Sequence, residues 1–183
     1  MSDHRPPLLW LTGPSGVGKT TLGREIFGGL GAAGIAGAFL DADQIGMVWP
    51  VPEDDQDLHG IKARNLGEVW RVFRAAGARC LVLAGGIDSA AQAKLYLDEV
   101  PGTAVTLCRL RAPEGQLRSR FLGRGWKPEI VDRIVGEAGA MDRSDFADLC
   151  VDIGGTTVGE AAALVLQRAG GWPGLRAEVG SDG

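Results

Sequence analysis

The sequence predicts an α/β fold, in which helices cover both faces of a mostly parallel sheet. Short apolar runs alternate with longer amphipathic stretches along the chain. A glycine-rich phosphate-binding motif stands between the first apolar run and the first amphipathic stretch. The chain has 183 residues, 45% of them hydrophobic and 23% charged, which is typical of one soluble domain with its own core.

Five short apolar runs predict the strands of this sheet. Each has the near-continuous apolar character expected of a strand that is covered on both faces. The predicted strands are residues 8–12, 36–41, 78–84, 103–109 and 149–153.

The amphipathic stretches between these runs predict the helices, at residues 19–30, 59–76, 89–99, 114–122, 129–141 and 158–169. For the last one, Thr157 followed by Glu160 predicts a capping box, and the pair Gly170 and Gly171 predicts its end. We therefore expect a single domain over residues 1–173 and a loose tail over 174–183. The long loop 44–58 carries an acidic run at 53–57, and loops of this length are usually functional or mobile.

The charge and cysteine content exclude several classes of protein. The formal net charge is −4 and no basic block is present, which argues against a nucleic-acid partner. No apolar stretch is long enough for a secretory signal or a membrane span, so we expect a cytoplasmic protein without a membrane partner. The three cysteines, Cys80, Cys108 and Cys150, are widely spaced within apolar runs and are predicted to be buried, reduced thiols.

The strongest functional signal is a complete P-loop pattern, Gly-x4-Gly-Lys-Ser/Thr, placed between a predicted strand and a predicted helix. Its glycines let backbone N–H groups turn toward phosphates, and the helix N-terminus adds positive potential. Lys19 is predicted to span the terminal phosphates and Thr20 to ligate Mg²⁺, so ATP and Mg²⁺ are the expected cofactors. The predicted nucleotide-binding residues here are Gly13, Pro14, Ser15, Gly16, Val17, Gly18, Lys19, Thr20 and Thr21.

Two large classes of P-loop protein lack support in this sequence. None of the four lysines stands in the Asn/Thr-Lys-x-Asp pattern that reads guanine, which argues against a switch GTPase. The third predicted strand ends in Gly85 and Gly86, without the acidic pair that motor and transporter ATPases use to activate water. These absences favour direct transfer of a phosphoryl group to a bound substrate.

Two carboxylates, Asp41 and Asp43, stand at the end of the second predicted strand. Residues i and i+2 of a strand point to the same face, so both are expected at the edge of the sheet where P-loop chemistry takes place. One carboxylate can hold a metal-bound water while the other accepts the proton of an attacking hydroxyl. The alternative is that these residues only cap the turn or helix that follows.

At these motifs the sequence resembles the small P-loop kinases, which include adenylylsulfate, shikimate and gluconate kinases and chloramphenicol phosphotransferase. Residues 9–13, 40–43, 67–69 and 76–77 are similar to adenylylsulfate kinases, although no full adenylylsulfate-binding pattern is present. Residues 83–86 are closer to the glycine motif of shikimate kinases, and residues 43–50 to chloramphenicol phosphotransferase. The resemblance covers residues 8–169 and implies a three-layer α/β/α P-loop fold with strand order 2-3-1-4-5.

The resemblance also implies roles for individual residues. Asp43 matches the aspartate that contacts the acceptor in shikimate kinases and chloramphenicol phosphotransferase, which makes it the preferred base and leaves Asp41 on the metal side. The segment 118–128 is similar to the short lid of these kinases. Its arginines, Arg120 and Arg124 first and Arg118 next, are expected to neutralise phosphoryl charge or stack on adenine. The alternative is a solvated arginine-rich helix face.

The remaining candidates belong to the two ends of the site. Gly155 and Thr156 resemble the loop on the adenine side. Candidate acceptor-binding residues are Asp43, Trp49, His59, Lys62, Arg64, Gly85 and Gly86. Of these, a histidine at a helix start is often only a surface residue, and Trp49 with its neighbours can equally pack under the loop.

Taken together, these patterns predict a phosphotransferase that moves the γ-phosphoryl group of MgATP to a hydroxyl of a small molecule, a metabolite or an antibiotic. Two alternatives stay open at this point. One is a nucleoside or nucleotide kinase, and the other is a nucleotide-binding regulatory protein that has no acceptor.

Overall fold

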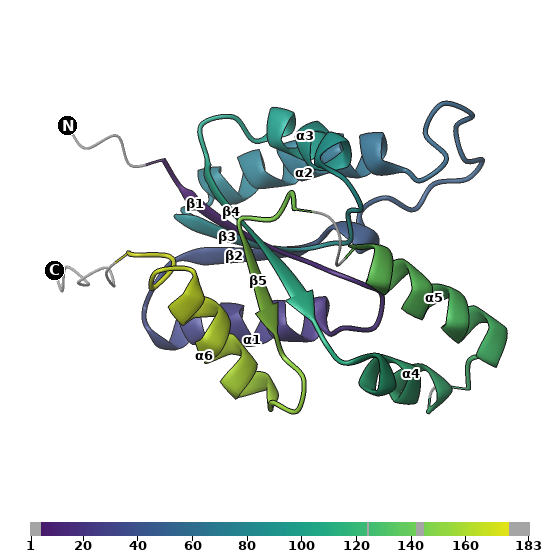
Figure 1. The fold of residues 1–183 in the computed structure, drawn as a ribbon. Coiled ribbons are helices and arrows are strands. Elements are labelled where there is room, and N and C mark those ends of the chain that lie inside the picture. The colour runs from purple at the N-terminus through teal and green to yellow at the C-terminus, as the bar shows by residue number, and fades with distance from the viewer. Residues whose placement is uncertain (1–4, 124, 142–144, 176–183) are drawn as a thin grey trace, which may run out of the picture.

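A five-stranded parallel sheet forms the centre of the molecule, with strand order β2-β3-β1-β4-β5 (Figure 1). The computed structural model describes residues 5–123, 125–141 and 145–175. The strands are β1 (Pro7–Thr12), β2 (Gly37–Asp41), β3 (Cys80–Ala84), β4 (Ala104–Arg111) and β5 (Leu149–Asp152). The predicted fold class and strand order are therefore confirmed, with strand ends that differ from the predicted ones by up to two residues.

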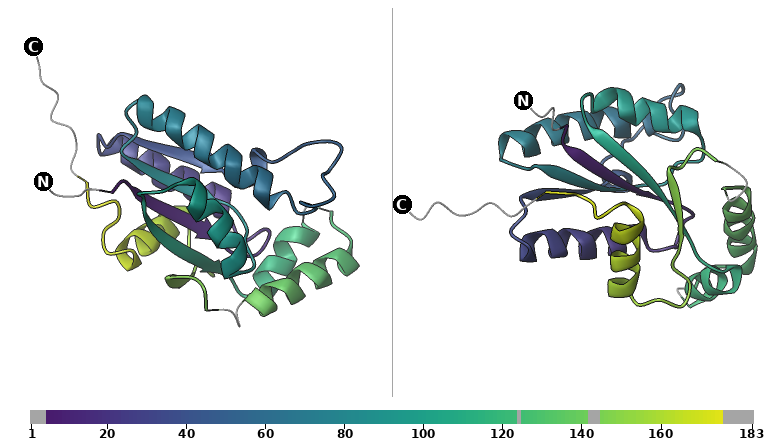
Figure 2. Two further views of the ribbon diagram at one scale, coloured as in Figure 1. Left: turned by 90° about the horizontal axis from the view of Figure 1, so that it is seen from above. Right: turned by 60° about the vertical axis from the view of Figure 1, so that its left-hand side comes forward.

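Helices cover both faces of this sheet, as Figures 1 and 2 show. On one face lie α1 (Lys19–Ala32) and α6 (Val158–Arg168), and on the other lie α2 (His59–Ala75) and α3 (Ala90–Glu99). Because successive strand residues point to opposite faces, β1 supplies both cores. Leu9 and Leu11 pack in the core beneath α1 and α6, whereas Leu8 and Trp10 pack in the core beneath α2 and α3.

The carboxyl ends of the strands are covered by a separate pair of helices, α4 (Glu114–Leu122) and α5 (Pro128–Met141). They pack on each other through a small apolar cluster of Phe121, Val131 and Ile134. The ring of Phe121 also lies under the P-loop, so close that a Cβ on Gly16 would be 2.5 Å from its Cζ. Phe121 thereby joins this helix pair to the phosphate-binding loop.

Some details of the sequence interpretation are confirmed and others corrected. The Thr157 and Glu160 capping box is present at the start of α6. Cys80 and Cys108 are buried, but Cys150 is exposed because it lies on the edge strand β5. Leu175 packs against the core, so the chain remains attached beyond the predicted start of the tail, whose residues 176–183 lie outside the described part. Within the described residues, no helix is long and apolar enough to cross a membrane.

We predict that Trp10→Phe lowers the free energy of unfolding by about 1–3 kcal/mol, because it leaves a buried carbonyl without its donor. The indole Nε1 of Trp10 donates a buried hydrogen bond of 3.1 Å to the carbonyl of Gly85. Urea denaturation measures the change. Trp49→Phe is the matched control, since Trp49 is 88% exposed and its replacement should change stability by less than about 0.5 kcal/mol. Equal stability of both variants would contradict a structural role for the Trp10 hydrogen bond.

Candidate active site

The P-loop connects the end of β1 to the first residue of α1, and its backbone requires glycine. Gly13 and Gly18 have φ values of 136° and 115°, which side chains rarely allow. A Cβ on Gly13 would also lie 2.6 Å from the carbonyl oxygen of Leu110 on β4. This geometry fits a loop whose amide groups turn toward bound phosphates.

Lys19, the first residue of α1, lies inside this loop. Its Nζ donates hydrogen bonds of 3.0 Å to the carbonyls of Gly13 and Pro14. Burial lowers the pKa of Lys19, while the nearby carboxylates of Asp43, Asp41 and Asp88 favour its charged form. An ammonium group thus lies where the terminal phosphates of a nucleotide would bind.

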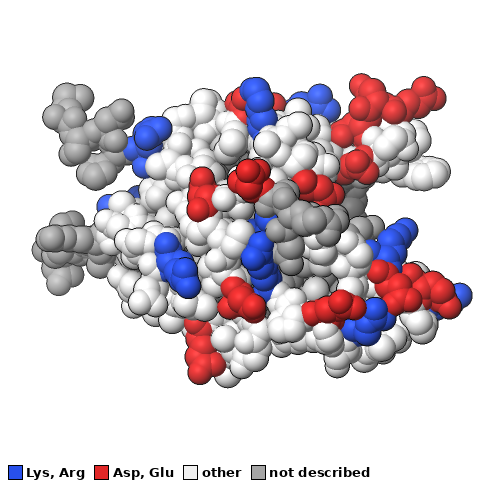
Figure 3. Space-filling model, viewed as in Figure 1, with Lys and Arg blue, Asp and Glu red and all other residues white. Residues whose placement is uncertain are grey.

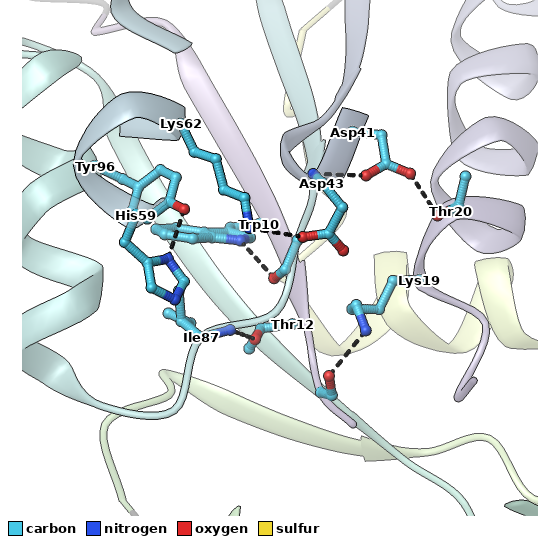
Figure 4. Close-up of polar contacts among 12 residues, drawn as sticks. Trp10, Thr12, Lys19, Thr20, Asp41, Asp43, His59, Lys62, Ile87 and Tyr96 are labelled. Carbon is cyan, nitrogen blue, oxygen red and sulfur yellow. Dashed lines mark hydrogen bonds and ion pairs between the residues drawn. The ribbon is translucent and has the colours of Figure 1, made fainter. Parts of the chain in front are cut away.

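The two predicted carboxylates reach the site by a different geometry from the one expected. β2 ends at Asp41, and Asp43 belongs to a 3₁₀ turn, η1 (Ala42–Gln44), so the two do not share a strand face. Asp41 is almost fully buried and does two things at once (Figure 4). One oxygen accepts a hydrogen bond of 2.6 Å from the Thr20 hydroxyl, and the other accepts one of 3.0 Å from the Asp43 amide. The capping alternative therefore applies to Asp41, in addition to its contact with the P-loop helix.

Asp43 points away from Asp41 toward the opposite side of the site. Its carboxylate lies 3.6 Å from the Nζ of Lys62, which extends from the first turn of α2 (Figure 4). Half of the Asp43 side chain remains exposed, at 54%, so it is accessible to a bound molecule.

Beside the P-loop lies a polar cavity of about 320 Å³. It brings together residues of the sequence-based set, Lys19, Asp43, His59, Lys62 and Gly86 among them, with three polar residues that the sequence analysis missed, namely Asp57, Asp88 and Gln92. The signal for Asp88 was its position just after Gly85 and Gly86, because the carboxyl ends of parallel strands share one edge of the sheet. Asp57 belongs to the acidic run of the long loop, in which the sequence alone does not distinguish one carboxylate from another.

His59 in this cavity is held by an aromatic cluster beneath it. Its Nδ1 is hydrogen-bonded to the Tyr96 hydroxyl at 2.8 Å, and the Tyr96 ring packs on Trp10 at 4.9 Å between centroids (Figure 4). Burial strongly raises the pKa of Tyr96, which keeps the hydroxyl protonated. Burial, helped by the charge of Lys62, lowers the pKa of His59 below its ordinary value of 6.5, so the imidazole is neutral at pH 7. His59 is therefore anchored, and is more than a surface residue at a helix start.

A second cavity, of about 270 Å³, lies on the other side of the P-loop, against α6. It is lined by the predicted residues Thr21, Thr156 and Arg120, with Ile153 and Val158 adding apolar surface. The guanidinium of Arg120 donates hydrogen bonds to the carbonyls of Gly16 and Val17, at 3.3 and 2.7 Å. This is a mixed apolar and polar cavity next to the phosphate cradle, as a nucleotide base requires.

Several predicted residues are not brought to either cavity. Arg118 is ion-paired with Glu114 and Asp132 on the outer side of α4 and α5, which fits the solvated-face alternative. Arg64 is on the exposed face of α2 and Trp49 projects into solvent.

Two backbone positions and one arginine complete the account of the predicted set. Gly85 does not line the polar cavity, and its carbonyl accepts the hydrogen bond from Trp10. Gly155, at a φ of 71°, shapes the loop before α6 without lining the second cavity. Arg124 lies outside the described residues.

The oxygen donors near the P-loop fit Mg²⁺ bound largely through phosphates and water. The described residues contain no group of three or more His, Cys, Asp or Glu side chains arranged to hold a metal ion by themselves. The Thr20 hydroxyl and the Asp41 carboxylate instead form a hydrogen-bonded pair at the start of α1. Mg²⁺ commonly keeps several waters and takes one or two protein oxygens with substrate phosphates, which this pair can provide.

The chain is similar in sequence to adenylyl-sulfate kinases. It is 26% identical over 179 residues to the enzyme of Vibrio cholerae serotype O1, covering 91% of this chain and 79% of that one. It is 28% identical over 181 residues to the enzyme of Shewanella oneidensis, covering 90% and 80%. No protein-family model matches the chain.

Solved structures share the fold at lower identity. The tunicamycin resistance protein of Deinococcus radiodurans has a TM-score of 0.68 at 19% identity, covering 91% of this chain and 96% of that one. The APS kinase of Mycobacterium tuberculosis, solved with AMPPNP and APS, has a TM-score of 0.63 at 19% identity and covers 91% and 98%. The shikimate kinase of Acinetobacter baumannii has a TM-score of 0.59 at 19% identity and covers 91% and 94%. Sequence and fold together confirm the resemblance to small ATP-dependent P-loop kinases.

We predict that the imidazole of His59 titrates below pH 6.5 in an NMR titration, since burial lowers its pKa. On acidification the unfolded chain takes up this proton first, so the free energy of unfolding should fall as the pH drops below about 6.5. Tyr96→Phe removes the hydroxyl that contacts Nδ1 but keeps the ring that helps to bury the imidazole, so the midpoint should stay below 6.5. The only other histidine is His4, so His59→Gln assigns the signals. A midpoint above 6.5 in the unmodified protein would contradict the buried, neutral imidazole.

Proposed function

We propose that this protein is an ATP-dependent phosphotransferase that moves the γ-phosphoryl group of ATP to a hydroxyl of a small molecule. The proposal rests on residues that two neighbouring cavities share. A small cavity inside the P-loop and the polar cavity beside it are both lined by Ser15, Lys19 and Asp43. A carboxylate and an ammonium group therefore face the boundary across which a phosphoryl group would pass.

In the proposed reaction Asp43 acts as the base. The acceptor oxygen forms a bond to the γ-phosphorus, the bond from that phosphorus to the β,γ-bridging oxygen breaks, and ADP leaves with the electron pair. The hydroxyl proton goes to the Asp43 carboxylate. Lys62, 3.6 Å from that carboxylate, orients it toward the cavity. General-base help of this kind is worth about 10² to 10⁴ in rate.

The nucleotide side is assigned to the P-loop and its neighbours. Lys19 holds the terminal phosphates, Thr20 ligates Mg²⁺, and Asp41 orients Thr20 and the metal's water shell. Mg²⁺ held at Thr20 and Asp41 would offset the negative charge of the phosphates. The adenine ring of ATP is assigned to the cavity against α6, near Thr156 and the loop that contains Gly155. Arg120 adds positive charge between the adenine ring and the phosphates of ATP, and Arg124 is proposed for the same purpose.

The polar cavity beside the P-loop, here assigned to the acceptor and called the acceptor-side cavity, argues against a regulatory protein without an acceptor. A regulatory protein that only binds a nucleotide has no need of a second polar cavity with a carboxylate at its junction with the P-loop. Transfer to a small molecule accounts for that cavity, for the sequence similarity to adenylyl-sulfate kinases and for the shared fold.

Lys19→Ala should lower phosphoryl transfer by about 10² to 10³ or more, because it removes a cation that faces the transferring group. The measurement is transfer of label from ATP labelled on the γ-phosphate to a panel of hydroxyl compounds. Lys94→Ala is the matched control, because Lys94 lies on the exposed face of α3 in an ion pair with Asp98. Unchanged turnover in Lys19→Ala, or no labelled product with the unmodified protein, would contradict the proposed function.

The two carboxylates should differ when each is changed to asparagine. Asp43→Asn should lower turnover by about 10² to 10⁴ while binding of a non-hydrolysable ATP analogue persists. Asp41→Asn should raise the Mg²⁺ concentration needed for activity, and excess Mg²⁺ should restore part of the rate. Turnover at increasing Mg²⁺ separates the two effects. Rescue of Asp43→Asn but not of Asp41→Asn would mean that the roles are exchanged.

A further inference from the structure

The acceptor-side cavity carries an excess of negative charge. Among its described lining residues, three carboxylates, Asp43, Asp57 and Asp88, face a single lysine, Lys62, apart from the P-loop Lys19. His59 adds no charge at pH 7, because its pKa is lowered. Once Lys19 is engaged by the phosphates of ATP, the cavity left for the acceptor is acidic.

Two of these carboxylates are available to a ligand. Asp43 is paired with Lys62. The carboxylates of Asp57 and Asp88, in contrast, accept no hydrogen bond and form no ion pair with other described residues, although both lie near enough to His59 to affect its pKa. Both line the cavity and are exposed, so they are open to a donor group.

The loop at the mouth of the cavity has the same sign of charge. Glu53, Asp54, Asp55 and Asp57 lie within five residues between η1 and α2, and Figure 3 shows acidic side chains gathered over this loop at the upper right. Asp55 fixes the loop to the start of α2, since its carboxylate accepts hydrogen bonds from the amides of Gly60 and Ile61 at 3.0 and 2.9 Å. This anchor holds Asp57 beside His59 and makes the entrance attractive to cations.

We infer that the acceptor is a hydroxyl compound that also carries an ammonium group, such as an amino alcohol or an amino sugar. Its ammonium binds to the free carboxylates of the cavity lining, Asp57 and Asp88, and its hydroxyl faces Asp43. An anion such as adenylyl sulfate would meet uncompensated carboxylates, and a neutral polyol would leave the excess charge unbalanced. This inference rests on the proposed function and specifies the substrate class of the same site.

The test compares acceptors that share one carbon skeleton and differ in charge. Suitable triads are glucosamine, glucose and gluconate, and ethanolamine, ethylene glycol and glycolate. With MgATP labelled on the γ-phosphate, the amine member should have a kcat/KM about ten- to a hundredfold above the neutral member, and the carboxylate should be the poorest. The preference should weaken as salt is added, because exposed charges are screened.

Variants then attribute this preference to particular residues. Asp57→Asn and Asp88→Asn should each raise the KM of the amine about tenfold or more. In Asp57→Asn, which does not act on Lys19, the KM of ATP and the use of the neutral member should change little. Asp54→Asn is the matched control, because it removes a charge from the same loop without lining the cavity. An equal loss in the control would overturn the assignment of Asp57.

The outcomes distinguish this inference from the proposed function. Preferred transfer to a neutral or carboxylate member would overturn the ammonium acceptor and leave the phosphotransferase intact. No labelled product from any member of either triad, or from the wider panel of hydroxyl compounds, would overturn both.

Discussion

The buried carboxylate of Asp41 joins the two halves of the site. Through one oxygen it holds the hydroxyl of Thr20, at the start of the P-loop helix, and through the other it holds the amide of Asp43, in the turn after β2. Because β2 and β1 are separated by β3 in the sheet, no strand pairing places these two segments together directly. This side chain adds a polar link between the start of the P-loop helix and the turn that carries the proposed base, beside the packing of α1 on β2 through Phe27 and Phe39. Its burial makes this link strong, since a buried charged acceptor that lost its donors would be costly.

The fold and the phosphate cradle could be predicted from sequence because both depend on local patterns. Continuous apolar runs indicate strands buried on two faces, and the P-loop is one continuous segment whose glycines are required by its own backbone. The Asp41 and Asp43 pair was also found, but for an incomplete reason. Strand periodicity was extended through Asp43, whereas Asp41 ends β2 by accepting the Asp43 amide and starts a 3₁₀ turn. Competition between a side-chain cap and the strand ladder is a short-range effect that periodicity does not contain.

The acceptor side could be predicted only in part, because tertiary contacts assemble it. Asp57 comes from the long loop, whereas Asp88 and Gln92 lie at the start of α3, where the Asp88 amide donates a hydrogen bond to the Gln92 side chain. Nothing in the sequence spacing links Asp57 to the other two. For Arg118 the sequence predicts a contact that the fold does not form. Its place in an arginine-rich helix suggests a phosphate contact, but in the structure its charge is paired with Glu114 and Asp132. The position of the His59 ring depends on Tyr96, 37 positions away, and on the tilted contact of the Tyr96 ring with Trp10. Such partners are visible only once α2 and α3 pack on the sheet.

The nucleotide side and the proposed acceptor side differ in whether backbone or side chains form them. The nucleotide side is built by backbone: glycine conformations, amide groups and a helix start, which tolerate little change. The proposed acceptor side is built by side chains on η1, on the loop before α2 and after β3, of which Asp43, Asp57 and Asp88 are exposed. Substitutions there can reverse the charge of the cavity while Asp41 still links the base to the P-loop. This chain, 26% identical to an adenylyl-sulfate kinase, thus combines a complete P-loop with a neighbouring cavity in which the described carboxylates outnumber the lysines.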